Sequence, residues 1–167
     1  MAEIMGRRSG PYTTREIITK AVCGFGEKSF QYMKLLRLPE NEVLTRVLGA
    51  SITRVVLPEP KEMTLPTRGE MYVPVAGSFD INVWYAYNDH LDTAVLRDRV
   101  TVSEMLPTTI TSTLAGDEVR ARVALTRPPE CTLAEAEDEG TIKVVVVFDV
   151  QAEIIAETKV AVQVITD

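Results

Sequence analysis

The side chains that most often perform catalysis or hold metal ions are scarce in this chain. Its 167 residues include one histidine, His90, and two cysteines, Cys23 and Cys131. His90 lies in a polar turn at residues 88–90, where no second partner is in view for a Ser–His–Asp or Cys–His pair. The cysteines stand far apart and match neither a zinc site nor a disulfide-rich scaffold. We therefore expect no enzymatic activity, no catalytic residues, no metal and no cofactor.

Two further segments resemble ligand-binding motifs only in part. Residues 24–26, Gly-Phe-Gly, lack the third glycine of a dinucleotide-binding loop, and no clear helix follows them, so a tight turn is favoured. The acidic residues at 135–139 lack the alternating ligands of a calcium loop, and a solvated hairpin tip is favoured there.

One predicted strand face combines polar groups with the single tryptophan. Alternation over residues 78–88 places Asp80, Asn82 and Trp84 together, opposite an apolar face. These three side chains could form a small ligand platform or a subunit contact, since tryptophan is frequent at interaction hot spots. The alternative is a buried indole, with Asp80 and Asn82 bonded to neighbouring backbone. Both interpretations stay open.

Two C-terminal segments supply further candidate interface residues. Residues 141–151 are apolar on both faces, so this strand is either central in the fold or covered on one face by another subunit. Residues 154–165 could form an edge strand, and an unpaired edge is a template for strand addition. The candidate interface residues in these segments are Val145, Val147, Val160, Val162 and Val164.

The elements that must carry these residues are predicted to be strands, because Val, Ile and Thr make up 49 of the 167 residues. The pattern predicts strands at 15–23, 28–36, 51–57, 78–88, 93–106, 118–125, 131–136, 141–151 and 154–165. It also predicts a short helix at 39–48, an extended loop at 58–69, and hairpin turns at 88–90 and 137–140. We expect an all-β, mainly antiparallel fold: a sandwich or barrel-like domain of about eight strands with at most one short helix.

Composition also bounds the domain organisation and the partners. We expect an N-terminal arm at 1–13 and a single β domain at 14–167, or two small β subdomains meeting near 58–70. No apolar run is long enough for a membrane span, and no secretion signal is evident, so we expect synthesis in the cytoplasm and no membrane contact.

The charge of the chain argues against nucleic acid as a partner and is compatible with a second copy of the chain. The net charge of −6 disfavours binding to nucleic acid. Residues 1–70 carry +3 and residues 71–167 carry −9, an asymmetry that could favour head-to-tail contact between copies.

Three segments, in order along the chain, carry a family resemblance. They are residues 15–22 (Arg-Glu-Ile-Ile-Thr-Lys-Ala-Val), 79–87 (Phe-Asp-Ile-Asn-Val-Trp-Tyr-Ala-Tyr) and 157–160 (Glu-Thr-Lys-Val), with support from 48–49, 99–100 and 128–131. Together they resemble the spore coat protein E (CotE) family over about residues 14–165.

This resemblance implies a non-enzymatic morphogenetic protein of the outer coat of bacterial endospores, made in the mother cell. It further implies homo-oligomers, recruitment of other coat proteins and dependence on a basement-layer coat protein. The chain departs from the family at Ala156, where glycine is usual and turn geometry could differ, and it lacks the long acidic C-terminal tail, so we expect partners to bind the folded body. The competing hypothesis is a small monomeric β module that binds a peptide or a glycan.

Overall fold

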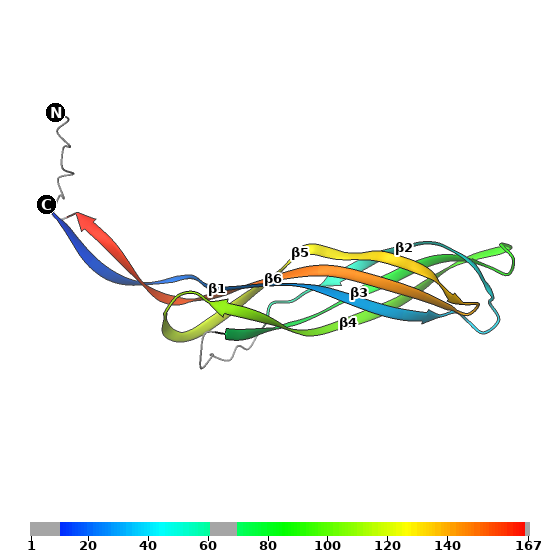
Figure 1. Ribbon diagram of the computed structural model, residues 1–167, viewed down its shortest axis with the longest axis horizontal. Coiled ribbons are helices and arrows are strands. Elements are labelled where there is room, and N and C mark those ends of the chain that lie inside the picture. Colours follow the sequence, from blue (N-terminus) through cyan, green and yellow to red (C-terminus); the bar gives the residue numbers. More distant parts are fainter. Residues whose placement is uncertain (1–10, 61–69, 166–167) are drawn as a thin grey trace, which may run out of the picture.

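The described part of the chain folds into six long β-strands that form one antiparallel sheet. The computed structural model describes residues 11–60 and 70–165 (Figure 1). The strands are β1 (Tyr12–Arg37), β2 (Leu44–Val56), β3 (Glu70–Tyr87), β4 (Asp92–Ile110), β5 (Leu114–Asp138) and β6 (Thr141–Ile165). The predicted all-β, antiparallel class is confirmed. The part of the chain that the structure describes has no helix long and apolar enough to cross a membrane.

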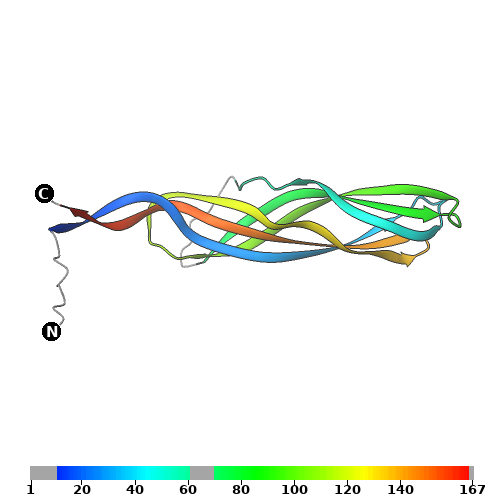
Figure 2. The same ribbon diagram turned by 90° about the horizontal axis from the view of Figure 1, so that it is seen from above.

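The sheet is folded into two layers along a long axis (Figures 1 and 2). The strand order is β2-β3-β4-β1-β6-β5, so one layer is β2–β3–β4 and the other is β1–β6–β5. Where the described strands join the two layers, the register pairs are Gly24 with Ile110 and Phe25 with Thr109. β2 and β5 stand at opposite ends of the strand order, which makes the fold an open sandwich instead of a closed barrel.

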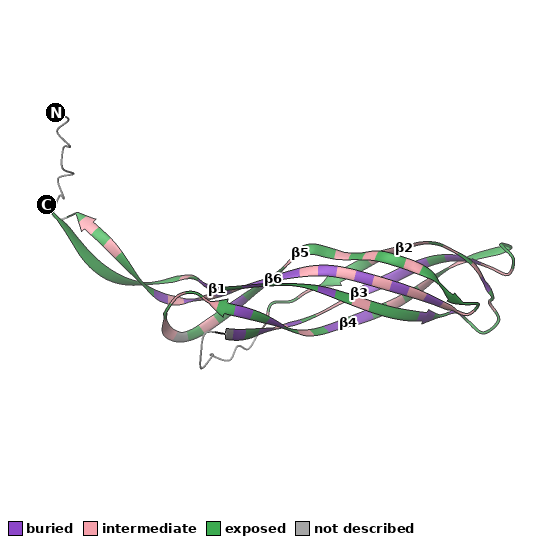
Figure 3. Ribbon diagram, in the orientation of Figure 1, coloured by how far each residue is buried: buried purple, intermediate pink, exposed green. Residues whose placement is uncertain are grey.

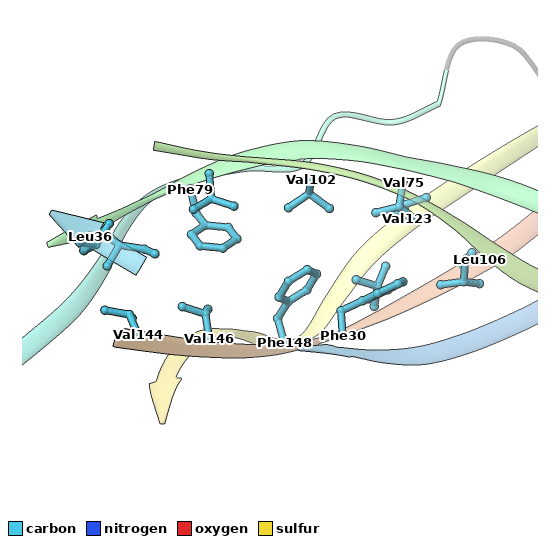
Figure 4. Packing of buried hydrophobic residues seen from close by; sticks show 14 of the residues in the cluster. Phe30, Leu36, Val75, Phe79, Val102, Leu106, Val123, Val144, Val146 and Phe148 are labelled. Carbon is cyan, nitrogen blue, oxygen red and sulfur yellow. The ribbon is translucent and has the colours of Figure 1, made fainter. Parts of the chain in front are cut away.

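The core lies between the two layers and is dominated by β-branched and aromatic side chains. Along β6, buried and partly exposed residues alternate from Thr141 to Thr158, as expected when one strand face packs on a core (Figure 3). Phe148 of β6 meets Phe79 of the other layer edge-on, with ring centroids 6.1 Å apart, and stacks on Phe30 at 5.4 Å (Figure 4). Each such aromatic pair contributes about 0.5–1.5 kcal/mol beyond the area it buries.

A hydrogen bond between side chains also links the layers. The Tyr32 hydroxyl of β1 donates to Glu104 Oε1 of β4 at 2.7 Å. Burial, reinforced by the Glu104 carboxylate, raises the pKa of Tyr32 above its ordinary value. The tyrosine therefore stays protonated and able to donate at neutral pH.

The predicted tight turn at residues 24–26 is wrong, because β1 continues through these residues, with a register shift against β6 between Val22 and Gly24. At this point β4 approaches β1 so closely that a side chain would not fit. A Cβ atom on Gly26 would meet the Pro107 carbonyl oxygen and lie 2.6 Å from Leu106 Cδ2, and one on Gly24 would lie 3.0 Å from the Thr109 oxygen. The two glycines permit this close approach of the layers.

Two other interruptions predicted between strand segments are also absent, because β5 and β6 are continuous there. β5 passes through Pro128 and Pro129 by shifting its register against β6 between Arg127 and Glu130, as a bulged edge strand can. β6 continues through residues 151–154 without a break, and Ala156 is a buried mid-strand residue opposite Ala21, not part of a turn. The nine predicted strand segments therefore become six longer strands in the residues that the structure describes.

The predicted helix at 39–48 is also wrong, whereas the two hairpin turns are confirmed. Leu44 begins β2, where its side chain is buried in the core and its N–H donates to the Glu139 oxygen at 2.8 Å. This tertiary anchor outweighs the helix-like spacing of the apolar residues. The β3–β4 turn has positive φ angles at residues 88–90, and the β5–β6 turn lies at 139–140. Of the loop predicted at 58–69, residues 58–60 lie outside the strands, and residues 61–69 fall outside the described residues, as do residues 1–10 of the predicted arm.

Candidate interaction surfaces

The two terminal strands extend beyond the body of the sandwich as a two-stranded ribbon. We define the terminal ribbon as residues 12–19 of β1 and 158–165 of β6, which pair from Tyr12 with Ile165 to Thr19 with Thr158. The ribbon projects along the long axis of the molecule (Figures 1 and 2). No described residue pairs with the outer edge of β1 at residues 12–19 or with the outer edge of β6 at residues 159–165. The candidate residues Val160, Val162 and Val164 lie here, so the predicted edge is present.

The ribbon starts where β5 leaves β6. The last β5 pair is Leu114 with Thr158, separated from the next pair, Val119 with Ala156, by a large register shift. The Thr158 hydroxyl donates to the Thr113 carbonyl oxygen at 2.7 Å and fixes this departure point. From residue 159 to 165, β6 pairs with β1, and no other described residue pairs with its second edge.

Apolar side chains are exposed along the ribbon. Tyr12 is 53% exposed, Ile18 59% and Ile165 69%. The sequence pattern indicated the β6 edge but missed its β1 partner, because pairing between the two ends of a chain leaves no local signal. The alternation of residues 15–23 is the one sequence feature that suggested a strand there.

Asp80 is buried under two arginines on the outer face of the β2–β3–β4 layer. Its side chain is 6% exposed, and its oxygens lie 3.4 Å from Arg99 Nε of β4 and 3.8 Å from Arg54 Nε of β2. Cross-strand register explains the arrangement, since Asp80 lies opposite Arg99 on one side and Thr53 on the other. The guanidinium groups compensate the charge that burial would otherwise penalise.

Asn82 is held in the same way one step along β3. Its Nδ2 donates to Thr53 Oγ1 at 2.8 Å, and its Oδ1 accepts from Arg97 Nε at 2.7 Å. The partners of Asp80 and Asn82 are thus side chains of neighbouring strands, not the backbone groups of the alternative prediction. With these bonds made inside the chain, the two polar groups are poorly placed to bind an external ligand.

Trp84 is the exposed member of this face. Its side chain is 41% exposed, not buried, and the ring lies over Gly49, where an added Cβ atom would sit 3.7 Å from Cε3 of the indole. Val95, its register partner on β4, is 51% exposed. Trp84 and Val95 therefore form an apolar surface beside the Asp80 and Asn82 ion and hydrogen-bond network.

The opposite outer face carries a second apolar surface. Val145 and Val147 of β6 are half-buried, and β6 is a central strand with β1 and β5 on its two sides. Met33 and Leu133 flank Val145 in register and are 61% and 36% exposed. The central position predicted for residues 141–151 is present, while the outer face stays open to a partner.

A groove lies at the base of the ribbon, lined by residues of β5 and β6 together with Lys20 of β1 and Glu59, which follows β2. Its volume is about 550 Å³, and it is lined by both signs of charge. The charged lining residues are Lys20, Glu59, Glu118, Arg120, Arg122 and Glu157. Three of these residues are basic and three are acidic, so the lining has no excess of either charge.

The histidine and the cysteines are dispersed. His90 is an exposed residue of the β3–β4 turn. Cys23 is buried in β1 with Sγ 3.6 Å from the Ala156 oxygen, whereas Cys131 is half-buried in β5 and its Sγ donates to the Leu133 oxygen at 3.2 Å. Burial raises the pKa of the Cys131 thiol, so the reactive thiolate is disfavoured at neutral pH.

The sequence also matches a protein-family model over nearly its whole length. The family is described as outer spore coat protein E (CotE), and the match covers residues 13–167. The chain belongs to the CotE family. As a member of this family it is a spore coat protein, and the family description locates it in the outer coat. Neither the curated proteins nor the solved structures that were compared gave a match.

Membership in the CotE family indicates that the exposed surfaces lie in a protein coat. The matched region contains the terminal ribbon except Tyr12, and both outer faces of the sandwich. A coat is a layer of many proteins in contact, so exposed apolar surfaces are expected to be covered there.

Proposed function

We propose that this CotE-family chain is a non-enzymatic structural protein that assembles with copies of itself and recruits other proteins to the outer spore coat. In this proposal it is made in the mother cell and attaches through a basement-layer coat protein. The observation that carries the proposal is the terminal ribbon, a two-stranded extension with exposed apolar side chains and open edges.

A two-stranded ribbon is a poor structure for an isolated monomer. Two strands alone are at best marginally stable in water, and open edges invite pairing with another chain. Tyr12, Ile18 and Ile165 stay more than half exposed in the single chain. Association would bury these side chains and pair the backbone groups along the open edges.

The outer faces supply room for further coat proteins. The Trp84–Val95 surface lies on one layer and the Met33–Val145–Leu133 surface on the other, so both could be occupied at once. The charge asymmetry of the sequence gives less support, because β1 and β2 of the first half are separated in the sheet by β3 and β4 of the second half, so the two halves do not form two oppositely charged ends.

Light scattering on the purified chain tests the self-assembly. We expect an oligomer at micromolar concentration, in which the apolar ribbon is covered. A monomer at every concentration up to the millimolar range would contradict the proposal. A monomer that also bound coat peptides or glycans saturably would favour the small binding module instead.

A further inference from the structure

The two open edges of the terminal ribbon differ in their chemistry. On the β6 strand, residues 159–165 read Lys-Val-Ala-Val-Gln-Val-Ile, with a single charge at one end and no proline or glycine. The β1 strand carries Arg15 and Glu16 in its middle. Charged side chains protect an edge from strand addition, whereas β-branched, weakly charged segments promote it. The β6 edge is therefore the one suited to a partner strand.

We propose that two copies of this chain join by antiparallel pairing of their β6 edges over residues 159–165, about a two-fold axis at Val162. The result is a continuous four-stranded sheet, in which each β6 strand lies between its own β1 and the β6 of the partner subunit. This inference rests on the proposed self-assembly and specifies its surface.

The sequence of the edge is complementary to itself in this register. Val162 lies opposite Val162 of the partner subunit, and Val160 opposite Val164 of the partner subunit. Because residues two apart share a strand face, the valines of both copies form one continuous apolar row. Cross-strand packing of this kind sets the register of a strand pair.

The charges also favour a second copy in this orientation. Lys159 is the one charged residue of the segment, and antiparallel pairing places it opposite Ile165 of the partner subunit. The two lysines therefore lie at opposite ends of the paired strands. Parallel pairing in register would instead set the two lysines side by side, which is unfavourable.

The shape of the molecule permits this arrangement. The ribbon projects along the long axis, and the body of the sandwich adjoins it only at the Thr158 end (Figures 1 and 2). Antiparallel pairing sends the two bodies away in opposite directions, so they do not collide. Four strands also exceed the three needed for a sheet that is stable by itself.

A reciprocal charge pair at the two-fold axis tests the interface. Val162→Glu and Val162→Lys are made in separate chains, and association is measured by sedimentation, with circular dichroism to check folding. We expect each variant alone to associate at least about tenfold more weakly, because like charges meet at the axis. Mixing the two variants should restore association. Val43→Glu, at a half-exposed valine of the loop between β1 and β2 that belongs to none of the interaction surfaces, is the matched control and should associate like the unmodified chain.

The possible negative results distinguish the proposed interface from the proposed self-assembly. If both Val162 variants associate as strongly as the unmodified chain, the β6 edge is not the interface, while the proposed self-assembly stands. If each variant fails but the mixture does not recover, the pairing at Val162 is overturned. If the unmodified chain does not associate at all, the proposed function falls together with this inference.

Discussion

Asp80 shows how a single residue organises the outer face of β2–β3–β4. Its carboxylate is almost fully covered, yet both arginines that neutralise it, Arg54 and Arg99, are more than half exposed. A buried charge is tolerated when it is paired, and the exposed parts of the arginines keep contact with water. Asp80 therefore contributes to holding three strands together, and the adjoining Trp84 surface rests on this network.

Removing that carboxylate should destabilise the fold. For Asp80→Ala we expect the free energy of unfolding to fall by about 1–3 kcal/mol, because two arginines lose their partner but can still be hydrated. Urea denaturation measures the change. Asp98→Ala is the control: Asp98 pairs with Lys34 at 3.4 Å, both side chains are well exposed, and the loss should stay below about 1 kcal/mol. Equal losses in the two variants would contradict the role assigned to Asp80.

The first strand shows that tertiary packing determines where a strand ends. β1 is a single strand because Gly24 and Gly26 let β4 approach its backbone, whereas the same glycines look like a turn in the sequence. This close approach is where the two layers join through the Gly24–Ile110 and Phe25–Thr109 pairs. The glycines thus serve the packing of the element and not a change of direction.

The effect of a glycine substitution on the free energy of unfolding should therefore depend on the position of the glycine. Gly26→Ala is expected to lower the free energy of unfolding by about 1–3 kcal/mol, because the new methyl group meets the Pro107 carbonyl and the Leu106 side chain. In Gly49→Ala the methyl group makes an ordinary contact with Trp84, so stability should stay the same or rise slightly. Thermal unfolding followed by circular dichroism compares the two. A Gly26 variant as stable as the Gly49 variant would refute the close-packing explanation.

At the scale of the whole molecule, a well-packed body is joined to a ribbon with little core of its own. The body encloses the aromatic cluster around Phe148, whereas residues 12–19 are all exposed (Figure 3). Local stability follows burial and contact density, so the ribbon should open far more readily than the body. Association through the ribbon would couple its folding to assembly.

Hydrogen exchange should reveal this division. In dilute, monomeric protein we expect amides of residues 12–19 and 158–165 to exchange much faster than those of the β6 segment around Phe148. At concentrations where the chain associates, amides of residues 159–165 should become protected. Mass spectrometry of peptides after deuterium labelling measures both. Equal protection of ribbon and body in the monomer would show that the ribbon is stable alone and needs no partner.

The sequence by itself determined the properties that depend on neighbouring residues. The β-branched composition and two-residue alternation predicted the all-β class, the segments 88–90 and 137–140 predicted the hairpin turns, and three motifs indicated the CotE family. The apolar alternation of Val160, Val162 and Val164 also predicted an edge in the last strand. These signals are local, since a side chain's face and a turn's backbone angles follow from adjacent residues.

Only the tertiary structure decided which segments meet. It paired residues 12–19 with 158–165 to make the ribbon, placed Arg54 and Arg99 around Asp80, and turned the apparent breaks in β1, β5 and β6 into continuous strands. Such contacts join residues far apart in the chain, and their stability depends on the packing of both partners together. The alternation of one strand carries no information about the strand that will lie beside it.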